Sequence, residues 1–202
     1  ATVTDGKWKV DLTVAPCVLD IDYGGGSEAW VDDADGDSSI ARWFIPTCNG
    51  KDATIYGTPG DNTLKGTDGA DVIHGLGGND TIKGFAGNDT LCGGPGADAI
   101  NGGSGGDKIF GQDGRDTVWG GSGSDVIEGG NGADTLNGDG GSDTIRGGKK
   151  GDTISGGDKG DSLYGNSGGD VIKGNRGPDL IRGGSGADTC TGGAGTDDIS
   201  GC

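Results

Sequence analysis

A nine-residue pattern of apolar and polar positions runs through most of the chain. From position 58 to position 201 the sequence divides into sixteen consecutive nonapeptides without an insertion. The seventh position is Ile, Leu or Val in fifteen of them, and Cys190 is the exception. Residues six to eight are of types that favour strands, and successive side chains of a strand point to opposite faces. The pattern predicts one short strand per repeat, with the seventh side chain inward and its two neighbours in solvent.

The remaining positions of each repeat predict a tight loop. The ninth position is Gly in all sixteen repeats, and the fifth is Asp in fifteen, with Asn62 as the exception. A Gly-Gly-x-Gly-x-Asp segment suits a tight loop because glycine reaches positive φ without steric cost. Two nonapeptides then complete one coil, and stacked coils form two parallel sheets that enclose the aliphatic side chains. Eight coils span roughly 38 Å at about 4.8 Å per strand.

The first part of the chain lacks this period. Alternating apolar residues from Trp8 to Val14 predict a half-buried strand, and residues 17–19 and 42–45 suggest others. Residues 53–57 fall in register with the nonapeptides. A repeat stack needs caps at its open ends, so we expect residues 1–52 to form an N-terminal β-rich capping domain and residues 53–202 to form the roll. The alternative for the first segment is a recognition module whose aromatic side chains contact a sugar or a protein, using Trp8, Trp30, Trp43 and Phe44.

The composition of the chain excludes several classes of protein. Glycine makes up 51 of the 202 residues and only 29% are hydrophobic, which is too little for a conventional core. With only 5 prolines the chain is not collagen-like, and the strict period argues against a linker. A net charge of −17 argues against nucleic-acid binding and indicates either plain solubility or a multivalent cation as partner. No apolar run approaches the ~20 residues needed to cross a bilayer.

The repeats resemble the RTX calcium-binding repeats of secreted bacterial toxins, proteases and adhesins. The shared motif is Gly-Gly-x-Gly-x-Asp-x-aliphatic-x, as in the segments GSGSDVIEG from Gly121 and NSGGDVIKG from Asn166, and the resemblance covers about residues 58–201. It implies an all-β fold, a right-handed parallel β-roll, with Ca²⁺ held between successive loops on the same edge. Turn formation alone also favours Asp, but it does not demand Asp at one fixed place fifteen times.

The resemblance also implies the calcium ligands. An ion takes the second, fourth and sixth residues of one six-residue loop and the first, third and sixth of the next loop on that edge. One such site combines Gly121, Gly123 and Asp125 with Gly138, Gly140 and Asp143, and its neighbour on the other edge combines Gly130, Gly132 and Asp134 with Gly147, Lys149 and Asp152. Eight loops per edge give at most seven sites, or up to about fourteen Ca²⁺ ions. The other expected ligands are Asp71, Asp80, Asp89, Asp98, Asp107, Asp116, Asp161, Asp170, Asp179, Asp188, Asp197, Gly94, Gly96, Gly103 and Gly105.

Several loops depart from the motif. Lys150 and Lys159 replace the later glycine of their loops, so we expect either a strained backbone or a shifted register, and an ammonium group as a substitute for an ion. We therefore expect disturbed sites around Asp152 and Asp161, and the loop with Asn62 is expected to bind weakly. The acidic cluster at residues 32–37 does not have EF-hand spacing and is interpreted as a solvated loop.

Five cysteines in a chain with extracellular features predict disulfides with one thiol left over. We expect a Cys17–Cys48 disulfide to stabilise the cap and a Cys190–Cys202 disulfide to close the last coil. Cys92 then lies on an outward position, either as a free thiol or as a link between chains.

These observations predict a secreted, extracellular bacterial protein that is not an enzyme. His74 is the only histidine, which excludes ordinary zinc ligand sets. One aliphatic side chain per repeat and a column of like charges predict that the metal-free chain is largely disordered and that Ca²⁺ folds it. A structural module that binds Ca²⁺, with end-to-end self-assembly as a variant, is the leading interpretation. The alternatives are an adhesion module for carbohydrate, protein or ice, and a secretion module detached from an enzyme or toxin.

Overall fold

The computed structural model describes residues 2–4, 7–9, 29–32, 38–41 and 45–202, which divide between two compact units, Ala1–Phe44 and Ile45–Cys202. In the first unit, β1 (Thr2–Thr4) pairs antiparallel with β2 (Lys7–Lys9), and β3 (Ala29–Asp32) pairs antiparallel with β4 (Ser38–Ala41). Trp8 lies in β2, as a strand was expected there. The residues predicted to continue this strand, the segment around Cys17, Arg42–Phe44 and most of the acidic cluster lie outside the described residues. The capping role of residues 1–52 stays a prediction.

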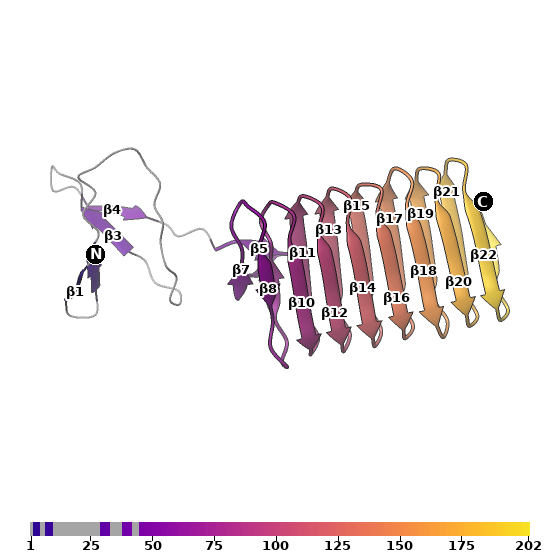
Figure 1. Ribbon diagram of the computed structural model, residues 1–202, viewed down its shortest axis with the longest axis horizontal. Helices are drawn as coiled ribbons and strands as arrows, with labels where there is room; N and C mark the ends of the chain where they lie inside the picture. Colours follow the sequence, from indigo (N-terminus) through magenta and orange to yellow (C-terminus); the bar gives the residue numbers. More distant parts are fainter. Residues whose placement is uncertain (1, 5–6, 10–28, 33–37, 42–44) are drawn as a thin grey trace. The chain divides into compact units, whose positions relative to one another are not determined.

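The second unit is a parallel β-roll, as the nine-residue period predicts (Figure 1). It has two sheets, and each strand pairs with the strand one coil away, so that Ile109 lies beside Ile127. The eight-stranded sheet contains β8 (Thr63–Lys65), β10 (Thr81–Ala86), β12 (Ala99–Ser104), β14 (Thr117–Ser122), β16 (Thr135–Gly140), β18 (Thr153–Asp158), β20 (Val171–Arg176) and β22 (Thr189–Ala194). The nine-stranded sheet contains β7 (Ile55–Tyr56), β9 (Val72–His74), β11 (Thr90–Pro95), β13 (Lys108–Asp113), β15 (Val126–Asn131), β17 (Thr144–Lys149), β19 (Ser162–Ser167), β21 (Leu180–Ser185) and β23 (Asp198–Ser200).

The core between the two sheets is one column of aliphatic side chains from each sheet. The seventh-position residues from Ile73 to Ile181 are fully buried and form a single cluster, and Leu64 and Cys190 pack against it half-buried at the ends. Ile55 also packs on this cluster, and β7 pairs with β9. The paired strands of the roll therefore include residues 55–56, and the domain boundary at residue 53 stays a prediction.

Most strands are longer than the three residues expected. In β15 and β17 the paired residues run from Val126 opposite Thr144 to Asn131 opposite Lys149. The pairing continues through the ninth-position glycine and into the following loop, where Gly130 and Gly148 have positive φ. The first residues of each loop are therefore still paired in the sheet. This pairing fixes the positions of the loop carbonyl groups relative to the neighbouring coils.

The loops depend on left-handed backbone at two places. Gly121 and Gly123 have φ of 105° and 132°, and a Cβ atom on Gly123 would lie 1.8 Å from the carbonyl oxygen of Gly105 in the preceding coil. Lys150 and Lys159 occupy the second of these places with φ of 71° and 77°. Of the two outcomes expected for these lysines, the structure shows the strained backbone, since hydrogen bonds keep the 18-residue spacing through this region.

The predicted Cys17–Cys48 disulfide is wrong, because Cys48 is bonded to Cys92. A hairpin of β5 (Thr47–Cys48) and β6 (Lys51–Asp52) lies on the outer face of the nine-stranded sheet, where Lys51 Nζ donates to Thr90 Oγ1 at 3.2 Å. Cys92 points outward from its strand, as expected, but the hairpin covers it and leaves only 2% of it exposed. Cys17 lies outside the described residues.

The second disulfide joins Cys190 to Cys202, the pair expected to close the last coil. One disulfide joins the hairpin to β11, which pairs with both β9 and β13, and the other closes the final coil.

Replacing Lys150 by glycine is expected to stabilise the roll by about 1 kcal/mol, because glycine adopts left-handed φ without the penalty that a Cβ atom incurs. Lys149→Gly is the matched control, since Lys149 is the adjacent lysine and does not have positive φ. Urea unfolding in calcium-containing buffer measures both free energies of unfolding. If Lys150→Gly lowers the free energy of unfolding as much as Lys149→Gly does, the backbone at Lys150 is not strained.

Candidate metal centre

The repeated Asp residues form two columns, one along each edge of the roll. The first edge carries the loops that end at Asn62, Asp80, Asp98, Asp116, Asp134, Asp152, Asp170 and Asp188, and the second carries those that end at Asp71, Asp89, Asp107, Asp125, Asp143, Asp161, Asp179 and Asp197. From Asp80 to Asp179 the side chains are at most 2% exposed. The fold thus buries a carboxylate in every one of these loops.

One oxygen of each carboxylate holds the coils together. Asp125 N donates to Asp143 Oδ1 at 2.8 Å, and Asp143 N donates to Asp161 Oδ1 at 2.9 Å. The same bond, between residues 18 apart, recurs along both edges from Asp71 to Asp197. Each Oδ1 atom therefore accepts a backbone hydrogen bond from the preceding coil.

The other oxygen has no partner. Among residues 45–202, thirteen Asp Oδ2 atoms are buried without any hydrogen bond, those of Asp80, Asp89, Asp98, Asp107, Asp116, Asp125, Asp134, Asp143, Asp152, Asp161, Asp170, Asp179 and Asp188. A buried acceptor without a donor costs about 1–3 kcal/mol, and more when it is charged. Thirteen repetitions of one such atom indicate a place for a ligand rather than a local packing fault.

Each unpartnered oxygen lies against the first glycine of its loop. A Cβ atom built on Gly120 would lie 2.5 Å from Asp125 Oδ2 and 2.8 Å from the carbonyl oxygen of Gly138 in the next coil. On the other edge, a Cβ on Gly129 would lie 2.6 Å from both Asp134 Oδ2 and the Gly147 carbonyl oxygen. Two oxygens from successive loops thus pack against the same glycine, where any side chain would collide with both.

The two sites expected from the sequence are partly assembled here. Asp125 and Gly138 meet at one point, and so do Asp134 and Gly147. Asp143 and Asp152 reach the preceding loop through Oδ1, as hydrogen-bond acceptors. The Gly140 carbonyl oxygen accepts the Gly123 N–H at 2.7 Å, so it binds the neighbouring loop directly.

Burial makes these carboxyl groups weak acids. It raises the pKa of Asp116, Asp143 and Asp152 to about 7, and that of Asp98 and Asp161 to about 6. Backbone hydrogen bonds oppose the rise, while neighbouring column carboxylates add to it. The charged form of the column is therefore unfavourable unless a cation lies beside it.

Oxygen-only surroundings fit Ca²⁺, a hard cation that takes 6–8 oxygen ligands at about 2.3–2.6 Å. Within the described part of the chain, no three His, Cys, Asp or Glu side chains come together as a metal cluster. Asp side chains and glycine carbonyls of successive loops would hold the ion.

One loop lysine, Lys150, affects a different carboxylate from the one expected for it. The charge of Lys150 opposes the rise in the pKa of Asp134 that burial causes. Asp134 ends the loop one coil before that of Lys150, whereas the sequence placed the disturbance at Asp152. Asp152 and Asp161 keep the buried, unpartnered Oδ2 of the regular loops.

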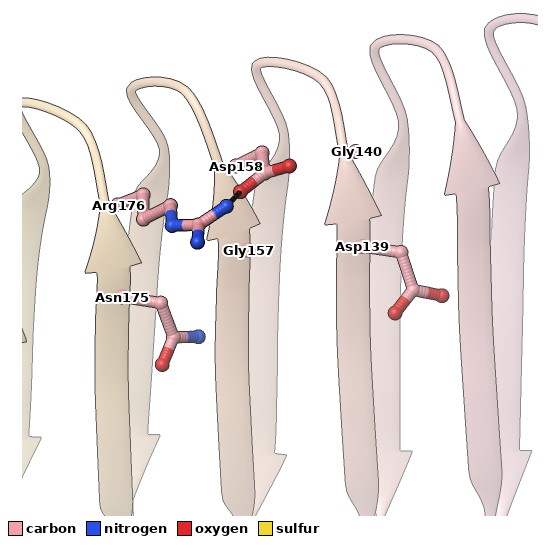
Figure 2. Close-up of a pocket in the computed structure, with 6 residues that line it drawn as sticks. All are labelled: Asp139, Gly140, Gly157, Asp158, Asn175 and Arg176. Carbon is pink, nitrogen blue, oxygen red and sulfur yellow. Dashed lines mark hydrogen bonds and ion pairs between the residues drawn. The ribbon is translucent and has the colours of Figure 1, made fainter.

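A shallow groove lies beside the second edge (Figure 2). It is lined by Asp139, Gly140, Gly157, Asp158, Asn175 and Arg176. Asp158 is already paired with Arg176 at 3.2 Å, and both side chains are largely exposed. The groove is open to solvent, so it lacks the enclosure typical of a small-molecule site.

Asp71 differs from the column that it begins. Its Oδ2 accepts hydrogen bonds from the Thr67 backbone and hydroxyl groups. Reasoning from the sequence placed Asp71 with the other ligands and missed this contact. The signal was present, because threonine stands at the second position of the loop only at Thr58 and Thr67.

Comparison with known proteins agrees with this geometry. The family described as "RTX calcium-binding nonapeptide repeat (4 copies)" matches in overlapping segments, 49–82, 56–91, 66–100, 93–127, 101–136, 119–149, 137–168 and 164–199. No curated protein matches the chain. None of the described residues form a helix of the length and apolarity needed to span a membrane. The matched segments cover residues 49–199 without a gap, and the chain belongs to the RTX calcium-binding repeat family.

Proposed function

We propose that this chain is an extracellular structural module whose roll assembles when Ca²⁺ binds between successive loops. The observation that carries the proposal is the set of thirteen buried Oδ2 atoms without a hydrogen-bond partner. A divalent cation at each of these oxygens would compensate the buried charge and link neighbouring coils. We assign the chain no reaction, since the carboxylates are already accounted for by this structural role.

The disulfides and the expected Ca²⁺ binding support an extracellular location. Disulfides persist mainly in oxidising compartments, and the roll has Cys48–Cys92 and Cys190–Cys202. Extracellular calcium modules work at Ca²⁺ dissociation constants of about 10⁻⁴–10⁻³ M. A chain that stays unfolded at low cytosolic Ca²⁺ and orders outside the cell would be easy to export.

Calcium is expected to convert the chain from largely disordered to β-rich at neutral pH. Far-UV circular dichroism of the Ca²⁺-free protein and of the protein in millimolar Ca²⁺ measures the change. Asp125→Asn should raise the Ca²⁺ concentration at the midpoint, because it weakens one buried ligand. Asp68→Asn is the control, since Asp68 is exposed and stands outside the Asp columns. Identical spectra with and without Ca²⁺ contradict the proposal.

Lowering the pH is expected to stabilise the metal-free roll and to weaken Ca²⁺ binding. Burial holds the pKa of Asp116 and Asp143 at about 7, above the value near 3.9 of an unfolded chain. Protonation therefore favours the metal-free roll, and this contribution is fully present below pH ~4 and is lost as the pH rises through about 7. Protons also compete with Ca²⁺ for the same oxygens.

Calcium titrations at pH 8 and pH 5.5, followed by circular dichroism, measure both effects. Calcium affinity should be weaker at pH 5.5, and the Ca²⁺-free protein should show more β-structure there than at pH 8. An affinity that is equal or higher at pH 5.5 contradicts the assignment of buried carboxylates as ligands.

We also propose end-to-end association of rolls. In the described chain β22 and β23 are the last strands of their sheets, and Ile199, at a seventh position, is 42% exposed. An exposed sheet edge with an apolar residue favours pairing with another chain. Ile199→Asp should shorten calcium-dependent filaments seen by electron microscopy. Val171→Asp is the matched control, because Val171 is 39% exposed on an outer face. Monomers at every Ca²⁺ concentration contradict association.

A further inference from the structure

The first coil of the roll closes its loops differently from every later coil. Its loops, residues 57–62 and 66–71, have Thr58 and Thr67 at their second position. Thr67 donates to Asp71 Oδ2 twice, from the backbone at 2.6 Å and from Oγ1 at 3.0 Å. The Oδ2 atom that is unpartnered in the thirteen later loops is therefore satisfied within the first coil.

The other loop of this coil repeats the arrangement with a neutral side chain. Thr58 N donates to Asn62 Oδ1, and Asn62 Nδ2 donates to Thr58 Oγ1 at 3.0 Å. Asn62 stands where the later loops of this edge have Asp. Both loops of the first coil thus pair a threonine with the last residue of the loop, and one of them carries no charge there.

The backbone explains why threonine fits here and not later. The second residue of every later loop has positive φ, from Leu76 at 78° to Gly193 at 110°, but Thr58 and Thr67 do not. A β-branched residue strongly disfavours positive φ. The threonine backbone places an N–H group at the carboxylate, in the position where the later loops leave the oxygen free. A donor at that point repels a cation.

We propose that both calcium columns begin at the second coil, at Asp80 and Asp89, and that the first coil is a metal-independent end piece closed by hydrogen bonds. This inference rests on the proposed function. It removes Asn62 and Asp71 from the ligands, although the regular motif includes Asp71.

The end piece is built to support the first metal-binding coil. Asn62 N donates to Asp80 Oδ1 at 2.7 Å, and Asp71 N donates to Asp89 Oδ1 at 2.8 Å. The carboxylates that begin the two columns are thereby oriented by a coil that needs no ion. The Cys48–Cys92 disulfide fixes the covering hairpin to β11, the third strand of the same sheet.

The test compares Asp71→Asn with Asp89→Asn in the full chain. The two residues are neighbours in one column, and asparagine can replace Asp71 because Asn62 already fills the equivalent place beside Thr58. Isothermal titration calorimetry and equilibrium dialysis against Ca²⁺ count the bound ions. Circular dichroism in Ca²⁺ verifies that each variant folds.

We expect Asp71→Asn to bind as many ions as the wild type and Asp89→Asn to bind at least one fewer. Equal losses in both variants overturn the inference and leave the proposed function standing. No loss in either variant shows that Asp89 is not the first ligand and also overturns it. A wild type that binds no Ca²⁺ overturns the proposed function itself.

Discussion

The structure depends on the way that buried carboxylates are compensated between coils. Each regular loop buries one Asp side chain, uses Oδ1 to hold the preceding coil, and leaves Oδ2 beside a glycine carbonyl of the following one. Backbone hydrogen bonds also join successive loops, and the core supplies only one aliphatic side chain per repeat. A cation or a proton must therefore accompany each carboxylate when the roll is folded, and the acidic composition of the chain follows from this requirement.

Glycine makes the same contact sterically possible. The first glycine of a loop lets the Asp and carbonyl oxygens approach the backbone closely, and the later ones allow left-handed backbone close to the neighbouring coil. Because glycine gains no stability from side-chain packing and loses much conformational entropy on folding, this choice weakens the chain in the absence of metal. The same residues that create the sites thus make folding dependent on their occupation.

Periodicity explains why much of the fold could be predicted from the sequence. A nine-residue repeat fixes which side chain faces inward. The buried column from Ile73 to Ile181 and both Asp columns could therefore be predicted from the repeat. Features that break the period could not be found in this way. Cys48 bonds Cys92 because a non-repetitive hairpin lies over the outer face of one sheet, and no spacing rule indicates that position. The closed loop of Asp71 was detectable in principle, since Thr67 interrupts the motif, but its meaning required the hydrogen-bond geometry.

The most direct test of the account is to locate the ions. Long-wavelength anomalous diffraction from crystals grown in millimolar Ca²⁺ would place each ion independently of the refined protein atoms. The account predicts anomalous peaks about 2.3–2.6 Å from the Oδ2 atoms of the regular loops, each also in contact with a carbonyl oxygen of the next coil. Well-ordered loops without anomalous peaks at these oxygens, in crystals saturated with Ca²⁺, would contradict it.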